Sequence, residues 1–313
     1  MEHSLHVRIF ELKIIFMGTP TYAQKILQDL IKASDMEVVA VYTQPDKPVG
    51  RKKIMTPPPV KLTAIEAGID VFQPARLREV LVVDELLKIE CDFIVVAAYG
   101  QILPKAILDH APCINLHASI LPKYRGASPI QKALLHGDKE TGVTAMKMDI
   151  GLDTGDILKI SKIDIDDDEM ADSLFEKLTY VASDLTLDVL REYETLTALK
   201  QDDALATHCS KITKNDAQIE FKDAMAIYNR YRAFTPWPGV HLESGLKLKE
   251  IKIHSACRTF EAGKIVEINK DHIVVGCTLG SLKIMRVQPE SKNEMDVLSY
   301  CNGKRLKVDD ILS

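Results

Sequence analysis

Three polar side chains in this sequence are of the types that together carry out acyl transfer. Asn115 and His117 alternate at the end of a short apolar run, so in a strand both side chains point to the same face. Asp153 stands in a glycine-bearing turn, residues 149–156, that can hold it in a constrained conformation. An amide donates to a developing oxyanion, an imidazole donates or transfers a proton, and a carboxylate orients the imidazole. Such a set needs no nucleophilic side chain.

From these residues alone, a purely structural interpretation stays open. In that interpretation Asn115 caps a turn, His117 is a buried core histidine and Asp153 closes a loop. A further stretch, residues 97–104, leads from an apolar strand end into a loop that can line a flat ligand. Ligands of an open parallel sheet bind outside the carboxyl ends of the strands, where we expect all of these residues to lie.

The elements that must position these residues are apolar runs alternating with helical patterns. They predict strands at 14–16, 38–41, 93–97 and 114–116, and helices at 22–31, 59–67, 104–108 and 128–135. Strands that are apolar throughout and separated by helices indicate an α/β fold with a Rossmann-like parallel sheet covered on both faces. The loop Met17–Pro20 lacks the GxGxxG spacing of a dinucleotide site, so no nucleotide cofactor is expected.

The rest of the chain divides at the polar stretch 200–208. Before it, strands at 143–148 and 156–160 bracket the turn of Asp153, and residues 171–199 form one long amphipathic helix or two shorter ones. After it come five short β runs, at 241–243, 246–254, 263–268, 272–277 and 282–287. Five β runs without crossover helices suggest a small β-barrel, for which an OB-like fold is one candidate.

The composition excludes several classes of protein. With 313 residues, 46% hydrophobic and 27% charged, the chain is long enough for two globular domains and is not disordered. Its apolar runs are strand-sized, far short of the roughly 20 residues that span a bilayer, so we expect a soluble protein and no membrane partner. The 6 cysteines form no CxxC pair and are too dilute for a disulfide framework, and the 9 histidines show no metal-ligand spacing with them. We therefore expect a cytoplasmic protein with free thiols and no metal.

One stretch of this acidic chain is basic. The net charge is −5, yet the segment from Thr43 to Lys61 carries a cluster of lysines and an arginine, one acid and several prolines. Such a loop is too long and too basic to be a simple connection, and it suits contact with a polyanion. A solvated loop without a partner is the alternative.

Longer motifs around these residues resemble the folate-dependent formyltransferase family. Residues 115–122 read NLHASILP, residues 124–130 read YRGASPI and residues 151–155 read GLDTG. Four more motifs are similar in order and spacing to the family members that act on methionyl-tRNA: FMGTP at 16–20, TQPDKPVGR at 43–51, AYGQILP at 98–104 and RAFTPWPG at 232–239. The resemblance covers the chain from about Lys13 to the C-terminal strands. Ile120 replaces a more usual leucine, which is a conservative change.

The resemblance implies a reaction and its substrates. The formyl donor would be 10-formyltetrahydrofolate, as a co-substrate, and the acceptor would be the α-amino group of methionine esterified to initiator tRNA. The product, N-formylmethionyl-tRNA, starts protein synthesis. Asn115, His117 and Asp153 fall on the family's catalytic positions.

The resemblance also implies which residues contact each substrate. The expected folate-binding residues are Val96, Ala97, Tyr99, Gly100, Leu103, Ser119, Ile120, Leu121, Pro122 and Asp149. The expected tRNA-binding residues are Lys47, Arg51, Lys52 and Lys53, in a loop that we expect to lack fixed structure without RNA. We further expect a monomer, with Trp237 buried in the C-terminal core.

The expected organisation is an extension at 1–12, a formyltransferase catalytic domain at 13–199, a linker at 200–208 and an OB-like tRNA-binding domain at 209–313. Three alternatives keep the formyl donor: the acceptor is glycinamide ribonucleotide, the acceptor is a nucleotide sugar, or the donor is hydrolysed as in the first domain of formyltetrahydrofolate dehydrogenase. Another is a tRNA-binding protein on an inactive enzyme scaffold. The loop of Arg51 argues against the first three, and the intact set of Asn115, His117 and Asp153 argues against the last.

Overall fold

The computed structural model describes residues 11–50 and 52–313, which form two compact units. Unit 1 holds the described residues up to Gly126 together with Thr141–Ile163 and Phe175–His208. Unit 2 holds Ala127–Glu140, Asp164–Leu174 and Cys209–Ser313. Most of the expected N-terminal extension lies outside the described residues, and the expected domain boundaries stay predictions.

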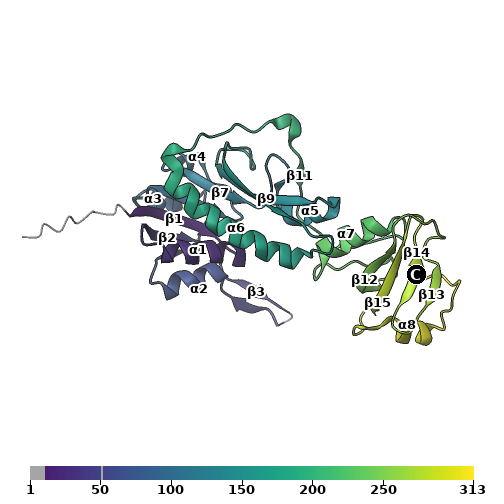
Figure 1. Cartoon of the computed structure of the whole chain (residues 1–313). Coiled ribbons are helices and arrows are strands. Elements are labelled where there is room, and N and C mark those ends of the chain that lie inside the picture. Colours follow the sequence, from purple (N-terminus) through teal and green to yellow (C-terminus); the bar gives the residue numbers. More distant parts are fainter. Residues whose placement is uncertain (1–10, 51) are drawn as a thin grey trace, which may run out of the picture. The chain divides into compact units, whose positions relative to one another are not determined.

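Unit 1 is built on a seven-stranded sheet of order β10-β9-β7-β6-β1-β2-β5 (Figure 1). Its strands are β1 (Leu12–Gly18), β2 (Met36–Tyr42), β5 (Val71–Phe72), β6 (Phe93–Ala97), β7 (Cys113–His117), β9 (Glu140–Lys147) and β10 (Ile157–Asp164). Neighbours from β5 to β7 pair in parallel, as predicted, whereas β9 pairs antiparallel with β7. The predicted α/β fold is confirmed, with a sheet that is mixed and mostly parallel.

The central strands are buried because both faces of the sheet are covered. Every residue of β6 is buried, and β1 is buried from Ile14 to Gly18. Continuous burial of this kind is typical of parallel strands between two helical layers. The helix α1 (Thr21–Lys32) buries one stripe, which includes Ile26 and Leu30, as the predicted amphipathic pattern requires.

Four further helices carry residues of unit 1. They are α2 (Pro59–Glu66), α3 (Val80–Leu86), α4 (Lys105–Leu108) and α6 (Ala171–Glu192). The pattern predicted all of them except α3, and α6 is one long helix followed by the short 3₁₀ turn Tyr193–Thr195. Two further short strands are β8 (Arg125–Gly126) and β11 (His208–Cys209), and two more 3₁₀ turns are Asp203–Leu205 and Asn215–Ala217.

The basic loop contains regular structure, which corrects the expectation that it lacks it. The strands β3 (Lys47–Val49) and β4 (Ile54–Thr56) pair antiparallel, with Lys47 opposite Thr56 and Val49 opposite Ile54. This hairpin extends away from the rest of unit 1 (Figure 1). Pairing between the two strands gives their backbone groups hydrogen-bond partners, and the proline-rich composition of the loop did not indicate this pairing.

Unit 2 is a small antiparallel β domain, as predicted, and its sequence after residue 208 also forms two helices that the pattern did not predict. The strands β12 (Lys247–Ser255), β13 (Ile265–Ile268), β14 (Ile273–Gly276) and β15 (Ser281–Gln288) pair in the order β12-β15-β14-β13, and β16 (Met295–Asp296) also pairs with β15. The expected run at 241–243 supplies only single bridges, at His241. Closure of this sheet into a barrel stays a prediction.

The helices of unit 2 are α5 (Pro129–His136), α7 (Ala224–Phe234) and α8 (Val297–Lys304). The Asp223 carboxylate caps α7 by accepting hydrogen bonds from the backbone N–H groups of Met225 and Ala226. Trp237 follows this helix with 57% of its surface exposed, so its predicted place in the core was wrong. In the described part of the chain, no helix combines the length and the apolar character needed to cross a membrane.

Candidate active site

The three candidate catalytic side chains meet at one point on unit 1. Asn115 and His117 lie on β7, and Asp153 lies in the turn between β9 and β10. The Asn115 amide Nδ2 is 3.4 Å from Asp153 Oδ1, and His117 Nδ1 is 3.6 Å from Asp153 Oδ2. Chain segments 38 residues apart in sequence thus place an amide, an imidazole and a carboxylate together.

The surroundings of His117 determine where its hydrogen atoms lie. Its side chain is 7% exposed, and Nε2 is 2.9 Å from the carbonyl oxygen of Tyr124. Because a carbonyl only accepts, Nε2 must carry a hydrogen atom and donate it. Nδ1 then faces the Asp153 carboxylate, so a doubly protonated ring has an oxygen atom near each N–H group. Nδ1 is the nitrogen that remains for chemistry.

Asp153 is held in an unusual backbone conformation. Its φ of +55° lies in the left-handed region, which non-glycine residues adopt only at a cost. Its Oδ2 accepts a hydrogen bond of 2.8 Å from the backbone N–H of Gly126. The start of the turn is shaped by Asp149, whose Oδ1 accepts from Gly151 N and Thr154 Oγ1 at 2.9 and 2.6 Å. Gly126, outside the turn, therefore fixes the carboxylate of Asp153, and Asp149 fixes the backbone at the start of the turn.

The turn approaches the site from an unexpected side. Because β9 runs antiparallel to β7, its final residue Lys147 lies opposite Ile114, near the beginning of β7. The turn must then fold back along β7 for Asp153 to come near Asn115 and His117. The prediction that this turn follows the carboxyl ends of parallel strands was wrong, although the residues do meet.

Comparison with known proteins identifies the family. Residues 12–190 match the family described as Formyl transferase, and residues 211–305 match Formyl transferase, C-terminal domain. A methionyl-tRNA formyltransferase of Sulfurimonas denitrificans is 63% identical over 302 residues, covering 96% of this chain and 100% of that protein. Methionyl-tRNA formyltransferases of Nitratiruptor sp. and Campylobacter jejuni are 56% and 47% identical, each covering 96% of this chain and 99% of the relative. The chain belongs to the methionyl-tRNA formyltransferase family.

Solved structures of other formyltransferases share the fold of this methionyl-tRNA formyltransferase family member. An N-formyltransferase from Helicobacter canadensis, crystallised with folinic acid and dTDP-3-aminofucose, aligns with a TM-score of 0.67 at 18% identity, covering 88% of this chain and 99% of that chain. The sugar 3N-formyl transferase WlaRD, crystallised with dTDP and 5-N-formyl-THF, aligns with a TM-score of 0.65 at 18% identity, covering 90% and 99%. At this identity the likeness supports the fold alone.

The residues expected to bind folate in this methionyl-tRNA formyltransferase family member fall into two groups. Six have buried side chains: Val96, Ala97, Tyr99, Leu103, Ser119 and Leu121. Tyr99 packs within the core beside β6, where burial raises the pKa of its hydroxyl, and Ser119 Oγ donates to the Lys123 carbonyl. Because these side chains are packed in the interior, contact with a ligand at these positions would come mainly from backbone atoms.

The second group of expected folate residues is accessible. Ile120 and Pro122 are half-buried, while Gly100 and Asp149 are exposed. Three large apolar side chains in the same loops, which sequence reasoning did not select, are also exposed: Ile102, Ile150 and Leu152. The sequence feature that could have identified them is a large apolar residue inside an otherwise polar or glycine-containing loop. These accessible groups form the surface that a flat, partly apolar ligand can contact.

The expected tRNA-binding residues Lys47, Lys52 and Lys53 lie on the β3–β4 hairpin and its apex. Lys47, Lys52 and Lys53 are exposed, and Arg51 lies outside the described residues. Apolar side chains share this hairpin, with Val49, Ile54 and Met55 exposed by 56%, 62% and 60%. At its base, Lys61 Nζ is 2.9 Å from Asp46 Oδ1. In this member of the methionyl-tRNA formyltransferase family the hairpin therefore presents cations together with apolar surface.

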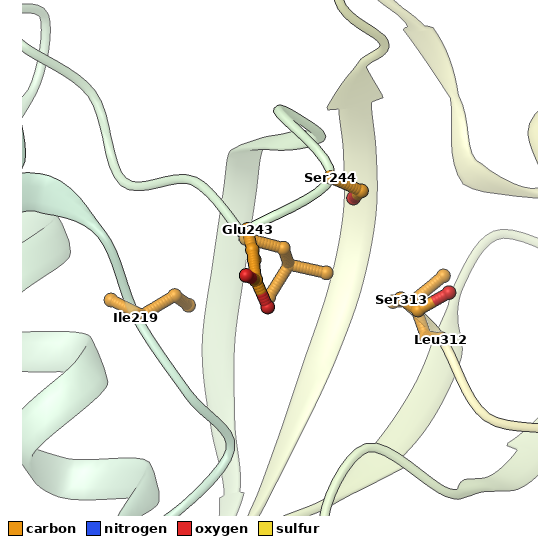
Figure 2. A pocket seen from close by; sticks show the side chains of 6 residues that line it. Ile219, Glu243, Ser244, Leu312 and Ser313 are labelled. Carbon is orange, nitrogen blue, oxygen red and sulfur yellow. The ribbon is translucent and has the colours of Figure 1, made fainter.

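Unit 2 contains a cavity of about 350 Å³. It is lined by Ile219, Leu242, Glu243, Ser244, Leu312 and Ser313. Figure 2 shows the Glu243 carboxylate between Ile219 on one side and Leu312 on the other. None of the residues expected to act in a methionyl-tRNA formyltransferase lines it. Within residues 11–50 and 52–313, no group of three or more His, Cys, Asp or Glu side chains is arranged to hold a metal ion.

Proposed function

We propose that this chain transfers the formyl group of 10-formyltetrahydrofolate to the α-amino group of methionine on initiator tRNA. The observation that carries the proposal is the convergence of Asn115, His117 and Asp153 on one point of unit 1. Membership of the methionyl-tRNA formyltransferase family supports the choice of substrates. We also propose that the enzyme works in the cytoplasm and as a monomer.

The donor groups of the site suit the charge that develops during the reaction. The neutral α-amine attacks the formyl carbon, a C–N bond forms, and the formyl oxygen becomes an oxyanion on a tetrahedral carbon. One N–H of Asn115 Nδ2 can point at Asp153 Oδ1 and the other at this oxyanion. Protonated His117 offers its Nδ1–H, because its Nε2–H already donates to the Tyr124 carbonyl. A donor of this kind is worth about 10² to 10³ in turnover.

The second half of the reaction moves one proton. The bond between the formyl carbon and N10 of the folate breaks, N10 gains a proton and the attacking nitrogen loses one. Asp153 Oδ2 lies 3.6 Å from His117 Nδ1, so the carboxylate keeps this side of the ring turned toward the site. The proton reaches N10 through His117 Nδ1 or through a water molecule bonded to Asp153.

The two substrates would contact different accessible surfaces of unit 1. The pterin would lie between the backbone around Val96–Pro104 and the turn that follows β9, whose exposed Ile150 and Leu152 supply apolar contact. The acceptor stem would contact the exposed lysines of the β3–β4 hairpin together with Arg51, through phosphates and unpaired nucleotides.

A formyl-transfer assay with several acceptors tests this function. Labelled 10-formyltetrahydrofolate is incubated with the enzyme and charged initiator tRNA, charged elongator tRNA, free methionine or water alone. We expect rapid labelling of charged initiator tRNA only. Equal labelling of elongator tRNA would contradict the choice of acceptor, and release of formate without an acceptor would indicate a hydrolase.

A further inference from the structure

A glutamine outside the three candidate catalytic residues bonds directly to the turn of Asp153. The Gln201 amide Nε2 donates to the carbonyl oxygens of Asp153 and Gly155, at 2.9 and 2.7 Å. Gln201 is 5% exposed, although it lies in the polar stretch expected to be a linker. Its two N–H groups therefore hold both sides of the peptide segment that carries the carboxylate.

An arginine fixes the orientation of this amide. Arg125, 4% exposed, donates from Nε and Nη2 to Gln201 Oε1 at 3.0 and 2.9 Å, and its Nη2 also donates to Asp203 at 2.8 Å. A guanidinium only donates and carbonyl oxygens only accept, so a flipped amide would face repulsion at every contact. The arrangement of Gln201 is thus unique.

The same short segment reaches Asp153 in a second way. The amide that follows Arg125, the backbone N–H of Gly126, donates to Asp153 Oδ2. The main chain of Asp153 is thus held through Gln201 and Arg125, and its carboxylate is held through Gly126. Both contacts act on a residue whose left-handed conformation needs support from its surroundings, since such conformations persist only where neighbours stabilise them.

We propose that Gln201, oriented by Arg125, is a positioning residue for Asp153 in the formyl-transfer reaction. This inference rests on the function proposed above. Without the two N–H groups of Gln201, the turn relaxes and the carboxylate moves relative to His117 Nδ1. A displacement of about 1 Å at a reacting group can cost about 10²-fold in rate, so the effect falls on kcat.

The substitution Gln201→Glu separates positioning from simple packing. Glutamate keeps the size of the side chain and an acceptor for Arg125, but it cannot donate to the carbonyls of Asp153 and Gly155. The control is Gln288→Glu, which makes the same chemical change at an exposed bond of 2.9 Å from the amide to the Lys292 carbonyl in unit 2. Steady-state assays give kcat and both KM values for each variant, and thermal unfolding gives its stability.

We expect Gln201→Glu to lower kcat by about 10- to 100-fold with both KM values within about twofold of wild type. Gln288→Glu should match wild type. In an Asp153→Asn background, Gln201→Glu should change kcat by less than about twofold, because the carboxylate that it positions is gone. Wild-type kcat in Gln201→Glu, or an undiminished effect in the Asp153→Asn background, would overturn the inference.

A second variant covers the case in which Gln201→Glu does not fold. Arg125→Lys keeps the positive charge near Asp203 but removes the two-donor hold on Gln201, and we expect kcat to fall by about 3- to 10-fold. An unchanged kcat in this variant would overturn the inference equally. If wild type and Gln288→Glu themselves do not formylate charged initiator tRNA, the proposed function fails, which is a different result.

Discussion

The site on β7 and the β3–β4 hairpin differ in how far their groups are fixed before any substrate arrives. The side chains of His117 and Asp153 are only 7% and 12% exposed, and each makes contacts with main-chain or side-chain atoms from other segments. The hairpin exposes residues on both of its strands and is held at its base by a few contacts, such as Lys61 with Asp46.

The difference corresponds to two kinds of work. Stabilising a charge that exists only in the transition state requires donors that already point at it, since reorganisation during the reaction would add to the barrier. Contact with a charged polymer depends mostly on Coulombic attraction and counterion release, for which exposed and adaptable cations suffice. A fixed site and an open one can therefore coexist in one unit.

The largest expected effect comes from removing a donor of the fixed site. Asn115→Ala, His117→Ala and Asp153→Ala should each reduce kcat by about 10² to 10³ or more, because the oxyanion or the proton loses its partner. Binding of charged tRNA, measured by filter retention, should stay near wild type. Near-normal turnover in one of these variants would remove that residue from its proposed role.

A pair of glycine substitutions compares the packing of the two regions. A Cβ at Gly155 would lie 1.7 Å from the Lys147 carbonyl oxygen, whereas a Cβ at Gly50 in the hairpin meets nothing within 4 Å. We expect Gly155→Ala to lower the free energy of unfolding by about 1–3 kcal/mol and to reduce kcat. For Gly50→Ala the cost is only that of a side chain at positive φ, about 1–2 kcal/mol. Because this cost is confined to the hairpin, the denaturation midpoint of the whole protein should hardly change. Equal denaturation midpoints for the two variants would contradict this contrast.

Removing cations from the hairpin should affect the tRNA substrate alone. We expect Arg51→Ala to raise KM for charged tRNA, with smaller increases for Lys52→Ala and Lys53→Ala, while KM for the folate stays unchanged. For each phosphate that a variant no longer neutralises, the slope of log K against log salt should become shallower by about 1. A folate defect in Arg51→Ala would instead place that residue near the donor.

The smallest expected effect concerns the base of the hairpin. Hydrogen bonds from Gln73 and then Lys61 hold the pKa of Asp46 below its usual value. Its stabilising contribution is therefore present above about pH 4 and disappears as the pH falls through the lowered pKa. We expect Asp46→Asn to lower the melting temperature slightly at neutral pH, and the difference from wild type to shrink as the pH falls below about 4 and to vanish below the lowered pKa of Asp46. A difference that grows with acidity would contradict this sign.

The sequence predicted correctly those helices and strands whose apolar residues recur at one regular spacing. The apolar run at 93–97 became β6 without change, and alternation placed Asn115 and His117 together on β7. The helix α7 was missed because its buried face contains Asn229 and Arg232, which interrupt the apolar period. Arg232 Nη2 donates to Asn229 Oδ1 at 2.6 Å, a partnership that only the folded chain supplies.

The site was predicted in its members but not in its geometry. Motif resemblance selected Asp153, while the antiparallel direction of β9, which brings its turn back along β7, cannot be read from an apolar run. Gln201 was missed for a similar reason. A glutamine in a polar stretch has the composition of a linker, and its burial depends on Arg125, far away in sequence.

The bond from Gln201 to the Asp153 turn also orders events during synthesis of the chain. The strands and turn that supply Asn115, His117 and Asp153 leave the ribosome before residue 201 does, yet two of the bonds that hold the turn must wait for that residue. A nascent chain can thus form most of the sheet while the turn of Asp153 still lacks its two hydrogen bonds from Gln201.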